Sequence, residues 1–96
     1  MNGPSSFKKV SEAIEKAYLG DGSIEIYYSR TEKSSEGWRE VNIHSITTDI
    51  PPLGEELVIG EDRLSPGHIM NAYDVNAKDG ELRSFIIGKI KDIRQI

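Results

Sequence analysis

Three cations, Arg39, Arg83 and Lys89, are the residues of this 96-residue sequence best suited to binding chemistry. A guanidinium group presents five N–H donors in a planar fork that matches a phosphate or a carboxylate, and an ammonium group adds a point charge. Arg83 and Lys89 share one parity in an apolar stretch, so on a straight strand their side chains would lie about 20 Å apart on one face. That spacing favours an extended anion over a single phosphate unless the strand bends, and Gly88 offers a place for a bend.

The same cations also have purely structural interpretations. Arg39 could lie at an exposed strand end and cover apolar surface, although Trp38 beside it suggests stacking and charge contacts with a single nucleic-acid strand. Arg83 could form an ion pair with one of three carboxylates: Asp74, Glu81 or Glu40. These interpretations stay open from the sequence.

No catalytic or metal-binding pattern accompanies the cations. The histidines His44 and His68 do not have the spacing of metal ligands, and the sequence contains no cysteine. It also contains no nucleophile-elbow, Walker or Rossmann motif. The carboxylates between Asp49 and Asp62 are more typical of a solvated acidic surface than of a hydrolytic pair. We therefore expect a non-enzymatic protein with no catalytic residue, metal or cofactor.

The composition predicts one globular domain over residues 1–96. Hydrophobic residues make up 36% and charged residues 29% of the chain, as in globular domains. The longest apolar runs are far shorter than the roughly 20 residues of a membrane span. No signal peptide is visible and cysteine is missing, so we expect a cytoplasmic location without membrane contact. The net charge of −4 argues against a generally basic surface for nucleic acid but allows a local basic strip.

Hydrophobic periodicity predicts one helix followed by strands. Apolar residues recur at helical spacing from Phe7 to Tyr18, with Ser5 or Ser6 as the N-cap, which places a helix at about 6–19. Alternating patterns predict strands at 23–30, 38–48, 68–75 and 82–90, and Asp79-Gly80 is a hairpin turn between the last two. We expect these strands to pack on the helix, within a region of about 23–93.

Two segments lie outside this pattern. Residues 49–67 contain Pro51-Pro52, several glycines and many carboxylates, which predicts an irregular and mobile insertion. Residues 91–96 either extend the last strand or begin a helix.

The order of several short motifs resembles the WYL domain family. That family typically has a strand ending in Tyr, then R-x-V-x-P, a W-Y-L-x-A-x-D strand and R-x-F-x-L-D-R-I. The matching residues here are Tyr28, Arg39-x-Val41, Ala72-Tyr73-Asp74 and Arg83-x-Phe85-x-Ile87-Gly88-Lys89-Ile90. The resemblance covers roughly residues 10–93. His68-Ile69-Met70 replaces the W-Y-L triplet, and Ile43 replaces the proline.

The resemblance implies a mainly β (α+β) fold, a small five-stranded SH3-like or Sm-like barrel preceded by one N-terminal helix. Such domains are regulatory ligand-sensing modules, often in bacterial transcription regulation beside a DNA-binding or helicase domain. Their proposed ligands are single-stranded nucleic acids or nucleotide-like anions. Carried over to this chain, the candidate ligand-binding residues are Tyr28, Arg39, His68, Arg83 and Lys89. The alternative is a protein-interaction module that uses the 49–67 insertion or an exposed barrel edge.

Overall fold

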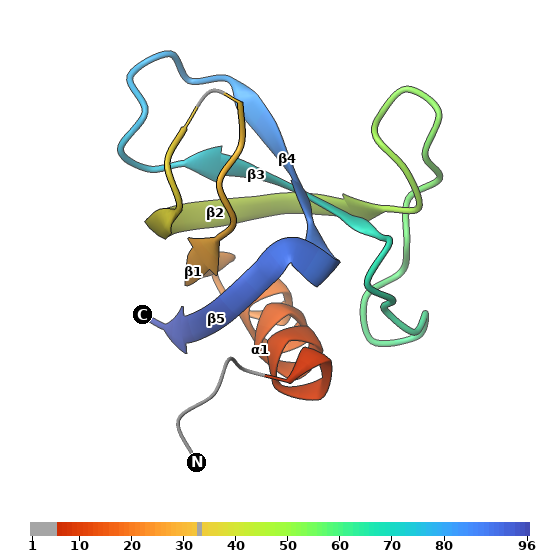
Figure 1. Ribbon diagram of the computed structural model, residues 1–96. Helices are drawn as coiled ribbons and strands as arrows, with labels where there is room; N and C mark the ends of the chain where they lie inside the picture. The colour runs from red at the N-terminus through yellow and green to blue at the C-terminus, as the bar shows by residue number, and fades with distance from the viewer. Residues whose placement is uncertain (1–5, 33) are drawn as a thin grey trace.

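A computed structural model describes residues 6–32 and 34–96 as one helix and a five-stranded antiparallel sheet. The elements are α1 (Phe7–Leu19), β1 (Ser23–Tyr28), β2 (Gly37–Thr47), β3 (Ile69–Asp74), β4 (Leu82–Ile86), the 3-10 turn η1 (Ile87–Lys89) and β5 (Ile90–Gln95). The strand order is β4-β3-β2-β1-β5, as can be followed in Figure 1. The mainly β prediction with one N-terminal helix is confirmed. Because β4 and β5 are the two edges of the described sheet, the barrel is not closed.

The helix α1 begins and ends close to the predicted positions. Ser6 is the N-cap, and its hydroxyl oxygen accepts a hydrogen bond of 3.3 Å from the backbone N–H of Lys9. Val10, Ile14 and Ala17 are buried on one face of the helix, which packs against β1, β2 and β5 (Figure 1). Within the described ranges, no helix is long and apolar enough to cross a membrane.

One face of the sheet carries the core, and we call it the inner face. Alternate residues of β1 are buried, ending with Tyr28, as the period of two in a strand requires. The same alternation buries further side chains of the other strands: Val41 and Ile43 in β2, Met70 and Ala72 in β3, and Phe85 in β4. Each of these three strands continues beyond its buried residues, so at least one more inner-face position follows in each of them.

The next inner-face positions hold charged residues. Arg39 lies two residues before Val41, Asp74 two residues after Ala72, and Arg83 two residues before Phe85. The register places Asp74 opposite Val41 and Arg83 opposite Ala72. The beginnings of β2 and β4 and the ends of β1 and β3 thus meet at one end of the sheet, where the inner face changes from apolar to charged.

The single strand predicted over 82–90 was wrong, because the chain turns at Ile87–Lys89. Gly88 donates its N–H to the carbonyl of Pro66 at 2.8 Å, and a Cβ at this position would lie 2.8 Å from the same oxygen. Only glycine allows this close approach of two backbone segments. After the turn, β5 pairs with β1, so residues 91–96 continue as a strand through Gln95 and not as a helix.

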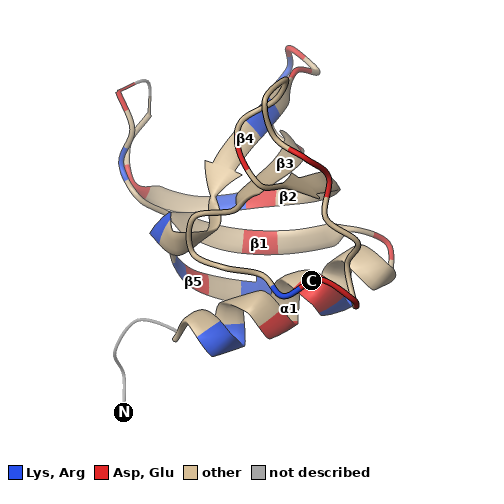
Figure 2. Cartoon of the chain, turned by 90° about the vertical axis from the view of Figure 1, so that its right-hand side faces the viewer, with Lys and Arg blue, Asp and Glu red and all other residues tan. Residues whose placement is uncertain are grey.

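The 49–67 insertion has an exposed tip and a packed base. Leu57 donates its N–H to Ile46 at 2.8 Å, and Ile59 and Leu64 are buried in the core. The side chains of Ile50 and Leu53, in contrast, are exposed. Carboxylates predominate here, and Figure 2, which looks onto this side of the molecule, shows acidic stretches along its loops.

We expect amide hydrogen exchange to distinguish the two parts of the insertion. The amide of Leu57 should be protected like those of β3, because it is hydrogen-bonded beside the core. The amide of Leu53 donates only to Ile50, at 3.2 Å within the exposed tip, and should exchange at least about tenfold faster. NMR-detected exchange would measure both, and equally fast exchange at both amides would contradict this division.

Candidate functional site

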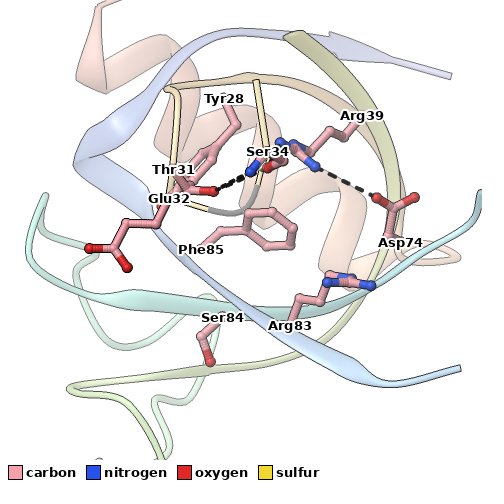
Figure 3. Close-up of a pocket in the computed structure, with 9 residues that line it drawn as sticks. All are labelled: Tyr28, Thr31, Glu32, Ser34, Arg39, Asp74, Arg83, Ser84 and Phe85. Carbon is pink, nitrogen blue, oxygen red and sulfur yellow. Dashed lines mark hydrogen bonds and ion pairs between the residues drawn. The ribbon is translucent and has the colours of Figure 1, made fainter. Parts of the chain in front are cut away.

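A pocket of about 700 Å³ opens at the charged end of the inner face. It lies between β4 and the segment that joins β1 to β2. Its lining residues are Tyr28, Thr31, Glu32, Ser34, Arg39, Asp74, Arg83, Ser84 and Phe85. Figure 3 shows Arg39, Asp74 and Arg83 arranged around one opening, with the rings of Tyr28 and Phe85 beside it. Three of the five candidate residues from the sequence therefore come together here.

Arg39 is held in place by neutral and charged partners. Its Nη2 donates to the hydroxyl of Ser34 and, at 3.1 Å, to the carbonyl of Ser35. Its Nη1 lies 4.0 Å from Oδ2 of Asp74, and these two side chains are 18% and 14% exposed. Because the low exposure reduces screening by water, we expect this pair to fix the guanidinium group more firmly than a surface ion pair would.

Arg83 has a looser arrangement. Its Nη2 lies 2.6 Å from Oδ2 of Asp79, in the turn before β4, and the two side chains are 40% and 42% exposed. The carboxylates suggested by the sequence, Asp74, Glu81 and Glu40, are not its partner. An ion pair this exposed contributes about 0–1 kcal/mol. Arg83 can therefore exchange Asp79 for a ligand at little cost.

Both arginines also have a donor without an acceptor among the described residues. The Nε atoms of Arg39 and Arg83 are buried and form no hydrogen bond with any described residue. Buried polar atoms in native proteins nearly always have a partner, and an unsatisfied donor costs about 1–3 kcal/mol. Both donors belong to side chains that line the pocket, where the oxygens of water or of a bound anion can pair with them.

Tyr28 and Phe85 form the apolar floor of the pocket. Their rings meet edge to face, with centroids 5.0 Å apart. The hydroxyl oxygen of Tyr28 accepts a hydrogen bond of 2.8 Å from the backbone N–H of Ile86. Burial raises the pKa of the Tyr28 phenol, while the bond from Ile86 and the charge of Arg39 act in the opposite direction. The phenol therefore stays protonated at neutral pH and connects β1 to the edge of β4.

Lys89 and His68 lie outside this pocket. Lys89 is exposed in η1 and borders a separate shallow depression with Arg30, Thr31 and Glu32. The imidazole Nδ1 of His68 accepts a hydrogen bond of 3.1 Å from the backbone of Ser65, in the turn before β3. The turn at Gly88 separates Lys89 from Arg83, whereas the sequence placed them on one strand.

Trp38 and Arg39 do not lie on one face of the sheet either. Neighbouring residues of a strand point to opposite faces, and Trp38 lies on the outer one. There its ring meets Tyr27 edge to face at 5.4 Å, and the guanidinium carbon of Arg94 lies 3.7 Å from its centroid. The two side chains therefore do not share a face, and contacts of both with a single nucleic-acid strand stay a prediction.

Asp74, Ser34 and Ser84 line the pocket but were not among the candidate ligand-binding residues, although the sequence suggested Asp74 as a possible partner of Arg83. Strand parity alone could have placed Asp74 on the inner face, since it lies two residues after the apolar Ala72. Its approach to Arg39 depends on the β2–β3 register, which no local pattern reveals. Across residues 6–32 and 34–96, no three His, Cys, Asp or Glu side chains come together in a way that could hold a metal ion.

Comparisons with known proteins add no relative from which the pocket could be interpreted. No protein-family model matches the chain. A search of curated proteins also finds no match. The geometry and chemistry of the pocket therefore carry the functional argument, and the WYL resemblance stays a hypothesis based on the short motifs.

Proposed function

We propose that this protein is a non-enzymatic, WYL-like ligand-binding module whose pocket holds an anionic group between Arg39 and Arg83. One observation carries this proposal: two arginines from different strands border one pocket, and each has a buried Nε without an acceptor in the described chain. A phosphate or a carboxylate supplies the missing acceptor oxygens in the planar geometry that guanidinium groups prefer. The small five-stranded antiparallel sheet is consistent with the SH3-like shape that the resemblance implies.

The two arginines have different parts in this proposal. Arg39 is preorganised, because Ser34, Ser35 and Asp74 hold its guanidinium group before any ligand arrives. Arg83 is exchangeable, because its partner Asp79 is exposed. An incoming anion takes the place of Asp79 on Arg83 and adds to the contacts of Arg39. Nucleotide-like anions are the first ligands to test, since a phosphate group offers the acceptor oxygens that guanidinium groups bind.

We expect a low-salt NMR titration with a nucleoside monophosphate to shift the signals of Arg39 and Arg83. Loss of a charge-assisted hydrogen bond costs about 1.5–3 kcal/mol, so Arg83→Gln should weaken binding roughly 10- to 100-fold. Arg63→Gln is the matched control, because Arg63 is exposed in the insertion, away from the pocket. Binding should also weaken as the ionic strength rises.

Two results would contradict the proposal. The first is the absence of shifts at Arg39 and Arg83 with either a monophosphate or a short single-stranded DNA at low salt. The second is equal loss of affinity in Arg83→Gln and Arg63→Gln, which would indicate general charge effects instead of a site. Unfolding of Arg83→Gln would favour the structural ion pair with Asp79 instead.

A further inference from the structure

The edge of β4 offers unpaired backbone groups beside the pocket. Ile86 donates its N–H to the Tyr28 hydroxyl, away from β3, and Ile87 donates to His68 on the β3 side. Outward and inward groups alternate along an antiparallel strand, so Leu82 and Ser84 also direct their N–H and C=O groups away from β3. In the described chain these groups have no partner, because no strand pairs with β4 on that side.

The opposite edge of the sheet is protected. The outward N–H of Ile93 in β5 is bonded to Oδ1 of Asp92 at 2.8 Å. The side chain of Gln95 reaches the carbonyl of Ala13 in α1 at 3.2 Å, and the helix packs along β5. Natural proteins commonly cover or block edge strands in this way. The β5 edge is thus covered, whereas the β4 edge is open. The open edge borders the anion pocket, since Ser84 of β4 is one of the residues that line this pocket.

We infer that the partner of this site is an extended peptide with one acidic side chain, which pairs with β4 and places that carboxylate between Arg39 and Arg83. The inference rests on the proposed anion site and names its ligand class. A strand added to β4 extends the sheet, so every second side chain falls on the inner face, which Arg83 and Phe85 share. Main-chain hydrogen bonds to Leu82 and Ser84 then provide affinity, and the carboxylate provides specificity.

The charges at the pocket favour a peptide over a nucleic-acid strand. Glu32 and Asp74 line the pocket together with the two arginines, and Asp79 lies against Arg83. The whole chain carries a net charge of −4. A nucleic-acid strand brings a phosphate at every nucleotide and would meet these carboxylates. A peptide of this kind brings a single negative charge. Its backbone also supplies hydrogen-bond partners for the outward N–H and C=O groups of β4.

The probe is a blocked peptide of sequence Thr-Val-Glu-Val-Thr, titrated into the full chain and followed by NMR. We expect shifts at Leu82, Ser84, Arg83 and Arg39. Replacing the peptide glutamate with glutamine should weaken binding about tenfold or more, since a charged hydrogen bond is lost. In a paired strand, only every second peptide amide donates to β4. N-methylation of the amides that face β4 should therefore abolish binding, whereas N-methylation of the amides that face away should leave it intact.

A pair of variants tests the backbone of β4 itself. Ser84→Pro and Ser84→Ala both lose the hydroxyl that donates to Asn71, but only proline also lacks the N–H. Proline is tolerated on an edge strand where the N–H faces outward. We expect Ser84→Pro to bind the peptide at least about tenfold more weakly than Ser84→Ala, because one main-chain bond is missing. If Ser84→Pro does not fold, the N-methylated peptides test whether the peptide forms main-chain hydrogen bonds with β4.

The outcomes separate this inference from the anion site. If a nucleoside monophosphate shifts Arg39 and Arg83 but the peptide does not, the peptide inference falls and the anion site stands. If short single-stranded DNA binds more tightly than the peptide, the ligand class is nucleic acid and the inference is overturned. If neither anion nor peptide shifts these residues, both proposals fall.

Discussion

Replacing Gly88 with alanine should lower the free energy of unfolding by about 3 kcal/mol, near the upper end of the usual cost of overpacking. The new Cβ would lie 2.8 Å from the carbonyl oxygen and 2.9 Å from the Cβ of Pro66. The hydrogen bond from Gly88 to Pro66 would lengthen as the two segments separate. Because this turn directs the chain from β4 to β5, the distortion affects both edges of the sheet.

Thermal and urea unfolding would measure the effect of this substitution. For a domain of this size, 3 kcal/mol corresponds to a fall in Tm of roughly 12–24 °C. Gly67→Ala is the matched control, since Gly67 is next to Pro66 and a Cβ there would have no atom within 4 Å. Similar losses in the two variants would show that the close approach at Gly88 is unimportant.

Local patterns in the sequence predict much of this fold because they report directly on burial. The helical spacing of Val10, Ile14 and Ala17 gives the buried face of α1, and the alternation from Ile24 to Tyr28 gives the inner face of β1. Parity also separates Tyr28 from Tyr27, and the structure places Tyr28 in the pocket. These features depend on near neighbours in the chain, which the sequence displays.

Contacts between distant segments explain what the sequence could not predict. The turn that ends β4 requires Pro66 to lie against Gly88, and the pair of Arg39 with Asp74 requires the register of β2 on β3. Arg83 pairs with Asp79 because the chain bends at the turn before β4. Composition and periodicity contain no information on such contacts between distant segments. The sequence therefore identified Arg39 and Arg83 as candidates, but it suggested Asp74 only as a partner of Arg83 and assigned neither Asp79 nor Glu32 to the site.

Tyr28 should be a position where substitution strongly affects stability. Loss of a buried aromatic ring costs about 3–5 kcal/mol in protein cores, so Tyr28→Ala should lower the free energy of unfolding by an amount in this range. Tyr28→Phe keeps the ring contact with Phe85 and removes only the acceptor for the Ile86 N–H. Leaving that donor unpaired should cost about 1–2 kcal/mol. Urea unfolding at pH 8 should give the highest free energy of unfolding for the wild type, a lower value for Tyr28→Phe and the lowest for Tyr28→Ala.

The stability difference between the wild type and Tyr28→Phe should also depend on pH. Burial raises the pKa of Tyr28 in the folded protein above its ordinary value of 10.0. Below pH 10 the phenol is protonated in both the folded and the unfolded state, so the difference stays constant. Above pH 10 the unfolded chain releases this proton and the folded protein keeps it, which stabilises the unfolded state.

The advantage of the wild type over Tyr28→Phe should therefore shrink by about 1.4 kcal/mol for each pH unit between the unfolded and the folded pKa. Urea unfolding of both proteins between about pH 8 and pH 11 would measure this slope. The other tyrosines are present in both proteins, so their titration cancels in the difference. A difference that grows as the pH rises past 10 would mean that the Tyr28 phenolate is stabilised in the folded protein. Arg39 would then dominate the electrostatics of the pocket floor, and burial would not.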